Sequence, residues 1–333
     1  MTAKTAAIAV FLFAPVAYAQ QSQTFDFTNP PNQQSLQEIA TILRTVGDIR
    51  NLSINPAPAS VAIQGTPDEL AMSGWIVHQL DQPASPPPST SSQFLVAGKS
   101  DDVIQVFHLA HIPTAPQAMQ EILTVLRTVA DIQKIFNYTP LTDIVIRGPA
   151  AQIALAQYLI GSFDVVPGTV TTSQEFPYLA PPPNHGPEVV RVFYLRNSPT
   201  PQAVQEVLTT LRVVAEIQKI FNYTPLTAMA IRGSASDLAT AEFLIQSLDM
   251  PSDAKAPPAD GVREFTIKAG DMIGVYNPAN IKGQDLNSTV TLVRQNLQIQ
   301  KAFMKTAPPA LIFRGTPDQI TKAEQLIRQK DQP

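Results

Sequence analysis

The chain has 333 residues, no cysteine and 31 prolines, and charged residues make up 15% of it against a usual value of about 25%. The lack of cysteine excludes disulfides, thiolate metal sites, cysteine nucleophiles and lipid-bearing cysteines. A 44% share of apolar residues is too high for a disordered chain, and the length favours two or more domains. The net charge of −4 argues against a nucleic-acid partner, because such proteins usually present a basic face.

Residues 1–19 have the pattern of a secretory signal peptide. Lys4 precedes a short apolar run at 6–14, and Ala17 and Ala19 supply the small residues of a cleavage site. The alternative is a transmembrane anchor, but the run is shorter than the ~20 apolar residues that a helical span needs. The sequence therefore predicts an exported protein.

Four copies of one unit follow this leader. The string IQKIFNYTPLT occurs at 132–142 and again at 217–227, and two weaker copies flank this pair. An arginine, a glycine and an aspartate keep the same spacing in every copy. These anchor residues are Arg44, Gly65 and Asp81; Arg127, Gly148 and Asp164; Arg212, Gly233 and Asp249; and Arg294, Gly315 and Asp331. Such self-similarity is typical of a repeat protein.

Each copy is predicted to form a strand, a helix, two strands and a second helix. In the third copy, 189–195, 220–223 and 228–232 have strand composition, and apolar residues from 204 to 215 recur at helical spacing. Thr66 and Thr316 each begin a capping box with proline at the first helical position. The anchor glycine is expected where a tight strand-to-helix turn needs positive φ or a close approach. The predicted fold class is α+β: tandem repeats of a small βαββα domain with a three-stranded sheet and two helices.

The first copy is expected to begin with a strand at 24–27 and a helix at 34–49, and the fourth with a strand at 264–267 and an insertion at 268–284. Proline-rich segments between copies favour extended, semi-rigid linkers. The predicted boundaries are 1–19 for the signal peptide, 22–83 for repeat 1, 84–101 for a linker, 102–165 for repeat 2, 166–187 for a linker, 188–250 for repeat 3, 251–261 for a linker and 262–331 for repeat 4.

A search for chemistry finds no converging functional groups. His108 and His111 straddle the end of a predicted strand and do not share a helical face as metal ligands would, so packing or a solvated loop is expected. No Gly-x-Ser-x-Gly, phosphate-binding glycine loop or His-Glu-x-x-His occurs. The sequence therefore predicts no enzyme activity, no cofactor and no bound metal.

The anchor arginines are the candidate interface residues. In three copies an acid follows four residues later, which suggests a solvated ion pair on one helix face. The alternative is a contact between domains or subunits. The candidates are Arg44, Arg127, Arg212 and Arg294.

Aromatic residues two apart share one face of a predicted strand, as do Phe136 with Tyr138 and Phe221 with Tyr223. RNA stacking on such a face is one interpretation. Packing beneath the helices explains the face equally well, and the acidic, exported chain favours packing. Trp75 lies in the second helix of repeat 1, where a partly buried core or interface role is expected.

The third copy combines a strand ending in Leu195-Arg196-Asn197, a Leu-rich helix and a hairpin. Ile231-Arg232-Gly233 and a helix closing at Leu248-Asp249 follow. In this pattern the copy resembles the periplasmic N-domains of bacterial outer-membrane secretins of type II secretion and type IV pilus systems. The resemblance extends to all four copies but includes no counterpart of the barrel region that follows in secretins. It implies a βαββα fold related to KH domains and no catalysis.

From this resemblance we expect a periplasmic ring or scaffold that acts by protein–protein contacts in a secretion or pilus apparatus. Its partners would be further copies of itself or other secretion-system proteins, with outer-membrane association only peripheral. The alternative is a monomeric periplasmic or secreted binding module for a peptide, a pilin or a cell-wall polymer. RNA binding through a KH-like fold would need a basic Gly-x-x-Gly clamp, which every copy lacks.

Overall fold

The structure is a computed structural model that describes residues 20–83, 93–98, 101–113, 115–169, 174–179, 186–251, 262–267 and 270–332. The predicted signal peptide lies outside these residues. No helix in the described ranges is long and apolar enough to cross a membrane.

Four units of the same construction follow one another along the chain. Repeat 1 consists of β1 (Gln21–Asp26), α1 (Gln33–Thr45), β2 (Leu52–Pro56), β3 (Ala59–Gly65) and α2 (Pro67–Leu80). Repeat 2 consists of β4 (Gln93–Leu95), β5 (Asp102–His108), α3 (Pro116–Val129), β6 (Lys134–Tyr138), the 3-10 turn η1 (Thr139–Leu141), β7 (Asp143–Pro149) and α4 (Ala150–Phe163).

Repeats 3 and 4 continue the pattern. Repeat 3 consists of β8 (Phe176–Tyr178), β9 (Glu188–Tyr194), α5 (Pro201–Val213), β10 (Lys219–Tyr223), η2 (Thr224–Leu226), β11 (Ala228–Gly233) and α6 (Ala235–Leu248). Repeat 4 consists of β12 (Arg263–Thr266), β13 (Met272–Tyr276), α7 (Gln284–Leu297), β14 (Lys301–Lys305), β15 (Ala310–Gly315) and α8 (Pro317–Lys330).

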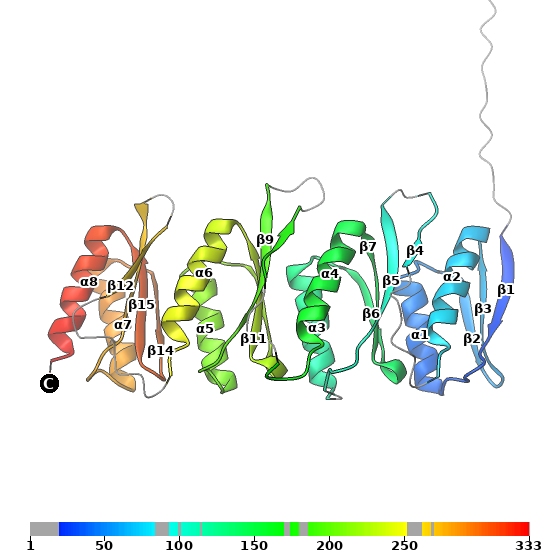
Figure 1. The fold of residues 1–333 in the computed structure, drawn as a ribbon, viewed down its shortest axis with the longest axis horizontal. Coiled ribbons are helices and arrows are strands. Elements are labelled where there is room, and N and C mark those ends of the chain that lie inside the picture. The colour runs from blue at the N-terminus through cyan, green and yellow to red at the C-terminus, as the bar shows by residue number, and fades with distance from the viewer. Residues whose placement is uncertain are drawn as a thin grey trace, which may run out of the picture.

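Every sheet is antiparallel, and the strand that precedes the second helix lies inside it. The orders are β1-β3-β2, β4-β5-β7-β6, β8-β9-β11-β10 and β12-β13-β15-β14. The two helices of a repeat cover one face of its own sheet, and the four repeats stand in a row (Figure 1). The predicted α+β fold class of repeated small domains is confirmed.

Two expectations at the edges of the repeats were wrong. Segments assigned to linkers contain β4 and β8, each of which adds a fourth strand to the sheet that follows. In repeat 4 the predicted first strand at 264–267 is the corresponding added strand, β12. The first strand proper is β13, which lies in the region taken for an insertion. Short apolar runs look alike in sequence, and only the pairing identifies them.

The anchor aspartates tie the end of each repeat to its beginning. Each follows the second helix, and its carboxylate accepts backbone N–H groups of the loop after the first long strand. In repeat 3, for example, Asp249 accepts from Arg196 and Asn197 at 2.6 and 2.9 Å. These charge-assisted bonds hold the loop to the end of the second helix.

The anchor glycines are explained by close approach. None of them is among the positive-φ residues. A Cβ on Gly65 would lie 2.7 Å from Oε2 of Glu69, and one on Gly233 would lie 2.8 Å from Cβ of Asp237. Glu69 and Asp237 complete capping boxes with Thr66 and Ser234. In repeats 1 and 3 the glycine thus leaves room for the side chain that caps the second helix, whereas Gly148 faces Gln152, which bonds to the carbonyl of Asp131. Close approach was one of the two explanations that the sequence offered.

Candidate functional site

The surfaces between successive repeats, which we call junctions, bring together side chains that lie far apart in the sequence. At each junction the helices of one repeat cover the outer face of the next repeat's sheet (Figure 1). The core of repeat 1 therefore includes Ile104, Val106 and Val145 from the sheet of repeat 2. A small βαββα unit has little core of its own, and sharing it with a neighbour increases burial.

The strand aromatics belong to these junctions. Tyr138 and Phe136 pack against the core of repeat 1, and Tyr223 lies 4.9 Å from Phe163 of repeat 2, measured between ring centroids. They pack beneath helices, as expected, and these helices are those of the preceding repeat. Because strand residues alternate between faces, a residue that points away from its own helices points toward the preceding repeat.

A cluster of ions recurs at every junction. At the first, Asp48 of repeat 1 accepts from Lys134 and from Nη1 of Arg147, which is 3.2 Å away. Arg147 also donates to the carbonyl of Val46 at 3.1 Å and to Asp102 of its own repeat at 2.9 Å. The Arg147 side chain is only 4% exposed. A buried guanidinium of this kind needs all of these acceptors.

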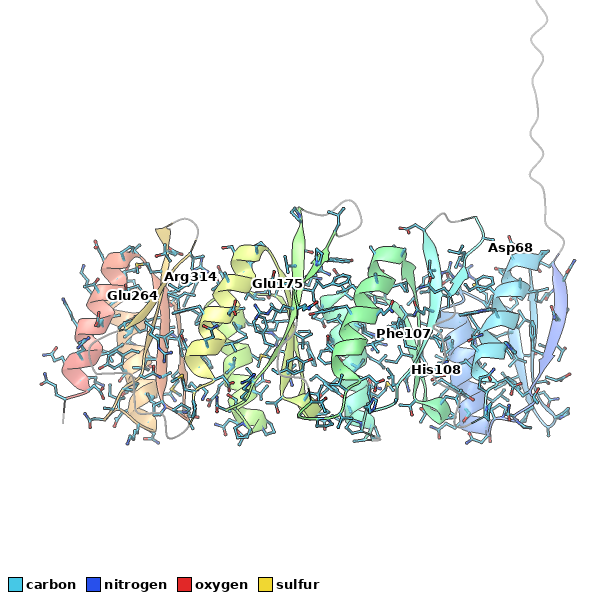
Figure 2. The ribbon with its side chains drawn as sticks, viewed as in Figure 1. Asp68, Phe107, His108, Glu175, Glu264 and Arg314 are labelled. Carbon is cyan, nitrogen blue, oxygen red and sulfur yellow. The ribbon has the colours of Figure 1, made fainter. Side chains whose placement is uncertain are left out.

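The second and third junctions repeat this cluster. Asp131 accepts from Lys219 and from Arg232, whose guanidinium also donates to the carbonyl of Val129. Glu216 accepts from Lys301 at 2.8 Å and from Arg314 at 3.0 Å. Figure 2 shows Arg314 on the sheet of repeat 4, on the side that faces repeat 3.

Two acids of this cluster, Asp131 and Glu216, stay ionised at lower pH than usual because their pKa values are lowered. Burial alone would raise the pKa of Asp131, but the hydrogen bonds from Lys219 and Arg232 outweigh burial and lower it. The hydrogen bond from Lys301 is the main reason that the pKa of Glu216 is also lowered. The junction therefore prefers the charged form of these carboxylates.

A second polar bond crosses each junction from the middle of the first helix. Glu38 accepts the backbone N–H of Thr139 at 2.8 Å and its hydroxyl at 2.9 Å. Glu121 binds Thr224 in the same way, with 2.7 Å for both bonds. The corresponding pair at the third junction is Glu206 with Thr306, at 3.0 and 2.7 Å.

An aromatic pair completes each junction. A ring on the second helix of one repeat lies against a phenylalanine on the added strand of the next. The pairs are Trp75 with Phe94, Tyr158 with Phe176, and Phe243 with Phe265, with centroid separations of 5.6, 5.0 and 5.0 Å. The interface role expected for Trp75 is the one seen here, and the added strands explain why the neighbouring phenylalanines recur.

Three of the four anchor arginines bond within their own repeats. Arg127, Arg212 and Arg294 donate to the strand carbonyls of Ile135, Ile220 and Ala302, at 3.4, 2.9 and 2.5 Å. The ion pair expected between each arginine and the acid four residues later was wrong. Asp48, Asp131 and Glu216 lie beyond the helix with positive φ, and they bond to the next repeat. An interface between chains at the four arginines stays a prediction.

The first junction carries a buried pair that the other two do not share. Nδ1 of His108 lies 2.6 Å from Oδ1 of Asp143, whose side chain is fully buried. Burial raises the pKa of Asp143 to about 6, against the opposing effect of His108. The hydrogen bond to Asp143 is the main cause that raises the pKa of His108. The corresponding residues of repeat 3 are Tyr194 and Ala228, which face each other in the same register.

The described part of the chain offers no assembled metal site: no group of three or more histidine, aspartate or glutamate side chains is placed to hold an ion. A cavity of about 630 Å³ lies beside Gly148 and is lined partly by Asp102, Asp131 and Arg147. The charged groups of this cavity already form the junction bonds described above. His111 lies in the loop after β5, and its backbone N–H donates to Asp164, which follows helix α4.

Sequence reasoning missed the residues that build the junctions. The signal was present, because the lysine, the arginine before the anchor glycine and the acid after the anchor arginine recur together. Their positions are Lys134, Lys219 and Lys301; Arg147, Arg232 and Arg314; and Asp48, Asp131 and Glu216. The partners lie about one repeat apart in the chain. Spacing within one helix therefore assigned each acid to the wrong arginine.

No family model matches the chain, and no curated protein matches it. Among solved structures, the N-terminal domain of the secretin XcpQ from Pseudomonas aeruginosa is 14% identical, over 44% of this chain and 62% of that chain, with a TM-score of 0.18. Aeromonas hydrophila ExeD is 14% identical over 89% of this chain, with a TM-score of 0.17. An aspartate kinase from Synechocystis is 14% identical over 93% of this chain, also with a TM-score of 0.17.

The chain spans 62%, 59% and 54% of the lengths of these three neighbours. The neighbours thus include secretin N-terminal domains and also an enzyme. At these identities and TM-scores the likeness carries no argument about function. The contacts at the junctions are the observations that bear on it.

Proposed function

We propose that this chain is an exported, non-enzymatic stack of repeats that acts by protein–protein contacts in a secretion or type IV pilus apparatus, as a periplasmic ring or scaffold. One observation carries the proposal. The residues that keep their spacing in all four repeats bind the repeat together, and those that recur at the three junctions join the repeats. The recurring polar residues therefore hold the repeats together, and a scaffold requires contacts of this kind.

The likeness to secretin N-domains in sequence pattern supports the secretion setting. XcpQ, ExeD and a pilotin–secretin complex, AspS–GspD, are among the structural neighbours, but the proposal does not depend on them. The partners in this proposal are further copies of the chain or other secretion-system proteins, with peripheral contact to the outer membrane.

The test is affinity purification of the tagged full chain from its native cells after cross-linking, with identification of the captured proteins by mass spectrometry. The proposal expects envelope secretion or pilus components, and light scattering of the purified chain should show oligomers. A chain that is monomeric at every concentration and captures no envelope component would contradict the proposal. That result would favour the monomeric binding module.

Export is tested separately. Removal of the predicted signal peptide should leave Gln20 as the first residue of the mature protein, which N-terminal sequencing of the purified protein reads directly. A chain that retains Met1 in the cytoplasmic fraction would contradict export without bearing on the junctions.

The anchor arginines enter this proposal as candidate contact residues. The guanidinium groups of Arg127, Arg212 and Arg294 are held at strand carbonyls, whereas Arg44 is exposed and forms no hydrogen bond in the described part of the chain. Arg44→Gln is therefore the first variant to test, because it changes a surface charge without removing a strand contact. It should weaken partner capture while leaving the circular dichroism spectrum unchanged.

A further inference from the structure

The junction is directional, because its two sides carry different chemistry. The helix face of a repeat presents an acid after the first helix, a glutamate within it and an aromatic residue on the second helix. The sheet face of the next repeat presents the lysine, the arginine, the threonine and the apolar strand residues that meet them. A stack with these junctions has two outer faces: the sheet face of repeat 1 and the helix face of repeat 4.

The outer sheet face of repeat 1 lacks the residues with which the sheets of the other repeats bind the preceding helices. Strand register places Ser22, Thr24, Ser53, Asn55 and Gln64 where repeat 2 has Ile104, Val106, Phe136, Tyr138 and Arg147. All five of the repeat 1 residues are exposed. Asn51 stands where the other repeats have the junction lysine, and Pro56 where they have the threonine.

The outer helix face of repeat 4 lacks the acids, the apolar residues and the aromatic ring with which the helices of the other repeats bind the next sheet. Ser288 stands where Glu38, Glu121 and Glu206 lie, and Gln298 where Asp48, Asp131 and Glu216 lie. Asn296 and Lys322 are exposed where repeat 1 has the buried Val46 and Met72. Gln325 occupies the place of the aromatic ring.

We infer that these two outer faces are terminal caps, which prevent this chain from adding a further repeat or a second copy end to end. A face of exposed hydroxyl and amide groups loses water on contact and gains little apolar burial in return. Repeat arrays generally need polar outer faces to stay soluble. The caps leave the sides of the stack as the surface for contacts with partners and further copies. This inference rests on the junctions alone and holds whether or not the chain works in secretion.

The first test is small-angle X-ray scattering of the full chain over a wide concentration range. The maximum particle dimension should stay at the length of one stack, even if the scattering mass rises through side-by-side association. A maximum dimension that doubles together with the mass would mean that ends join, and would overturn the inference.

The second test restores each face separately in the full chain. The sheet-face variant carries Ser22→Ile, Thr24→Val, Asn51→Lys, Ser53→Phe and Gln64→Arg. The helix-face variant carries Ser288→Glu, Asn296→Val and Gln298→Glu. Each new residue is the one found at an internal junction.

Neither restored face meets its complement in a solution of one variant, so each variant alone should keep the length of one stack. An equimolar mixture should form a pair of twice the length that high salt weakens, because the new ion pairs are partly exposed. Mixtures of each variant with the wild-type chain are the matched controls and should not pair. Circular dichroism checks that both variants fold. If folded variants do not pair on mixing, or if a control mixture pairs as well, the assignment of the caps to these residues is wrong.

Discussion

Nη2 of Arg232 donates to Oδ2 of Asp131 over 2.6 Å and joins the sheet of repeat 3 to the helices of repeat 2. The Arg232 side chain is 4% exposed and that of Asp131 is 40% exposed. The pair is therefore asymmetric: its acid can be hydrated, but its guanidinium depends on protein acceptors. The two residues are 101 positions apart in the chain.

Arg232→Gln should destabilise the protein strongly. Glutamine is the residue that repeat 1 has at this position, as Gln64. The change removes the hydrogen bonds to Asp131 and to the carbonyl of Val129, so we expect a loss of about 1–3 kcal/mol in the free energy of unfolding. Urea denaturation measures it. Arg50→Gln is the matched control: Arg50 is exposed, and its removal should cost no more than about 0.5 kcal/mol.

Glu121 and Thr224 should be energetically coupled. Glu121→Ala removes two hydrogen bonds across the second junction, which are worth about 1 kcal/mol each. A double-mutant cycle with Thr224→Val should give a coupling energy of about 0.5 kcal/mol or more. Additive losses within error would show that the two side chains do not interact in solution.

Two glycine-to-alanine changes should have opposite signs. A Cβ at Gly233 would lie 2.8 Å from Cβ of Asp237, so Gly233→Ala should cost about 1–3 kcal/mol through overpacking. Gly161 lies inside helix α4 with nothing within 4 Å of such an atom. Gly161→Ala should therefore stabilise by up to about 1 kcal/mol. Thermal unfolding compares them, and equal effects would contradict the role assigned to the anchor glycine.

The single tryptophan reports on the first junction. Trp75 packs against Phe94 with 5.6 Å between ring centroids, and both are partly buried against the core of repeat 1. Phe94→Ala should expose the indole and shift its fluorescence to longer wavelength. Phe176→Ala, the same change at the second junction, is the matched control and should leave the emission unchanged. A shift of equal size in both variants would mean that Trp75 senses global loosening.

The pair of His108 and Asp143 should make stability fall as pH rises. Both pKa values are raised in the folded protein, so both groups bind more protons folded than unfolded. Asp143 then loses stability from about pH 4 to its folded pKa of about 6, and His108 loses stability above about pH 6.5.

The control for this pH dependence is the double variant His108→Tyr with Asp143→Ala, which takes the residues of repeat 3 at these positions. Its free energy of unfolding should lack the decline above about pH 4 that the wild-type chain shows. Identical pH profiles for the two proteins would rule out the pair as the source of the decline.

Much of the fold was readable from local sequence. The helical spacing of apolar residues after 204 and the capping boxes at Thr66 and Thr316 depend on neighbouring residues, and the structure confirms the helices that they predict. The added strands were missed because a short run such as β4 is a strand only by virtue of its pairing with β5. The anchor arginines were noticed for their spacing, but spacing cannot tell a strand carbonyl from an interface.

The amino-acid sequence by itself determined that this protein is a row of four like units, because periodicity, caps and turns act over a few residues. Only the tertiary structure decided how the units join and which faces remain open. Asp131 binds Arg232, and Glu38 binds Thr139, although the partners lie about a hundred residues apart in the chain. These contacts depend on the packing of one repeat on the next and not on proximity in the sequence. Gln64 and Gln298 are ordinary polar residues in the sequence. Only the packing of the repeats shows that they lie on the two outer faces, which we infer to be caps.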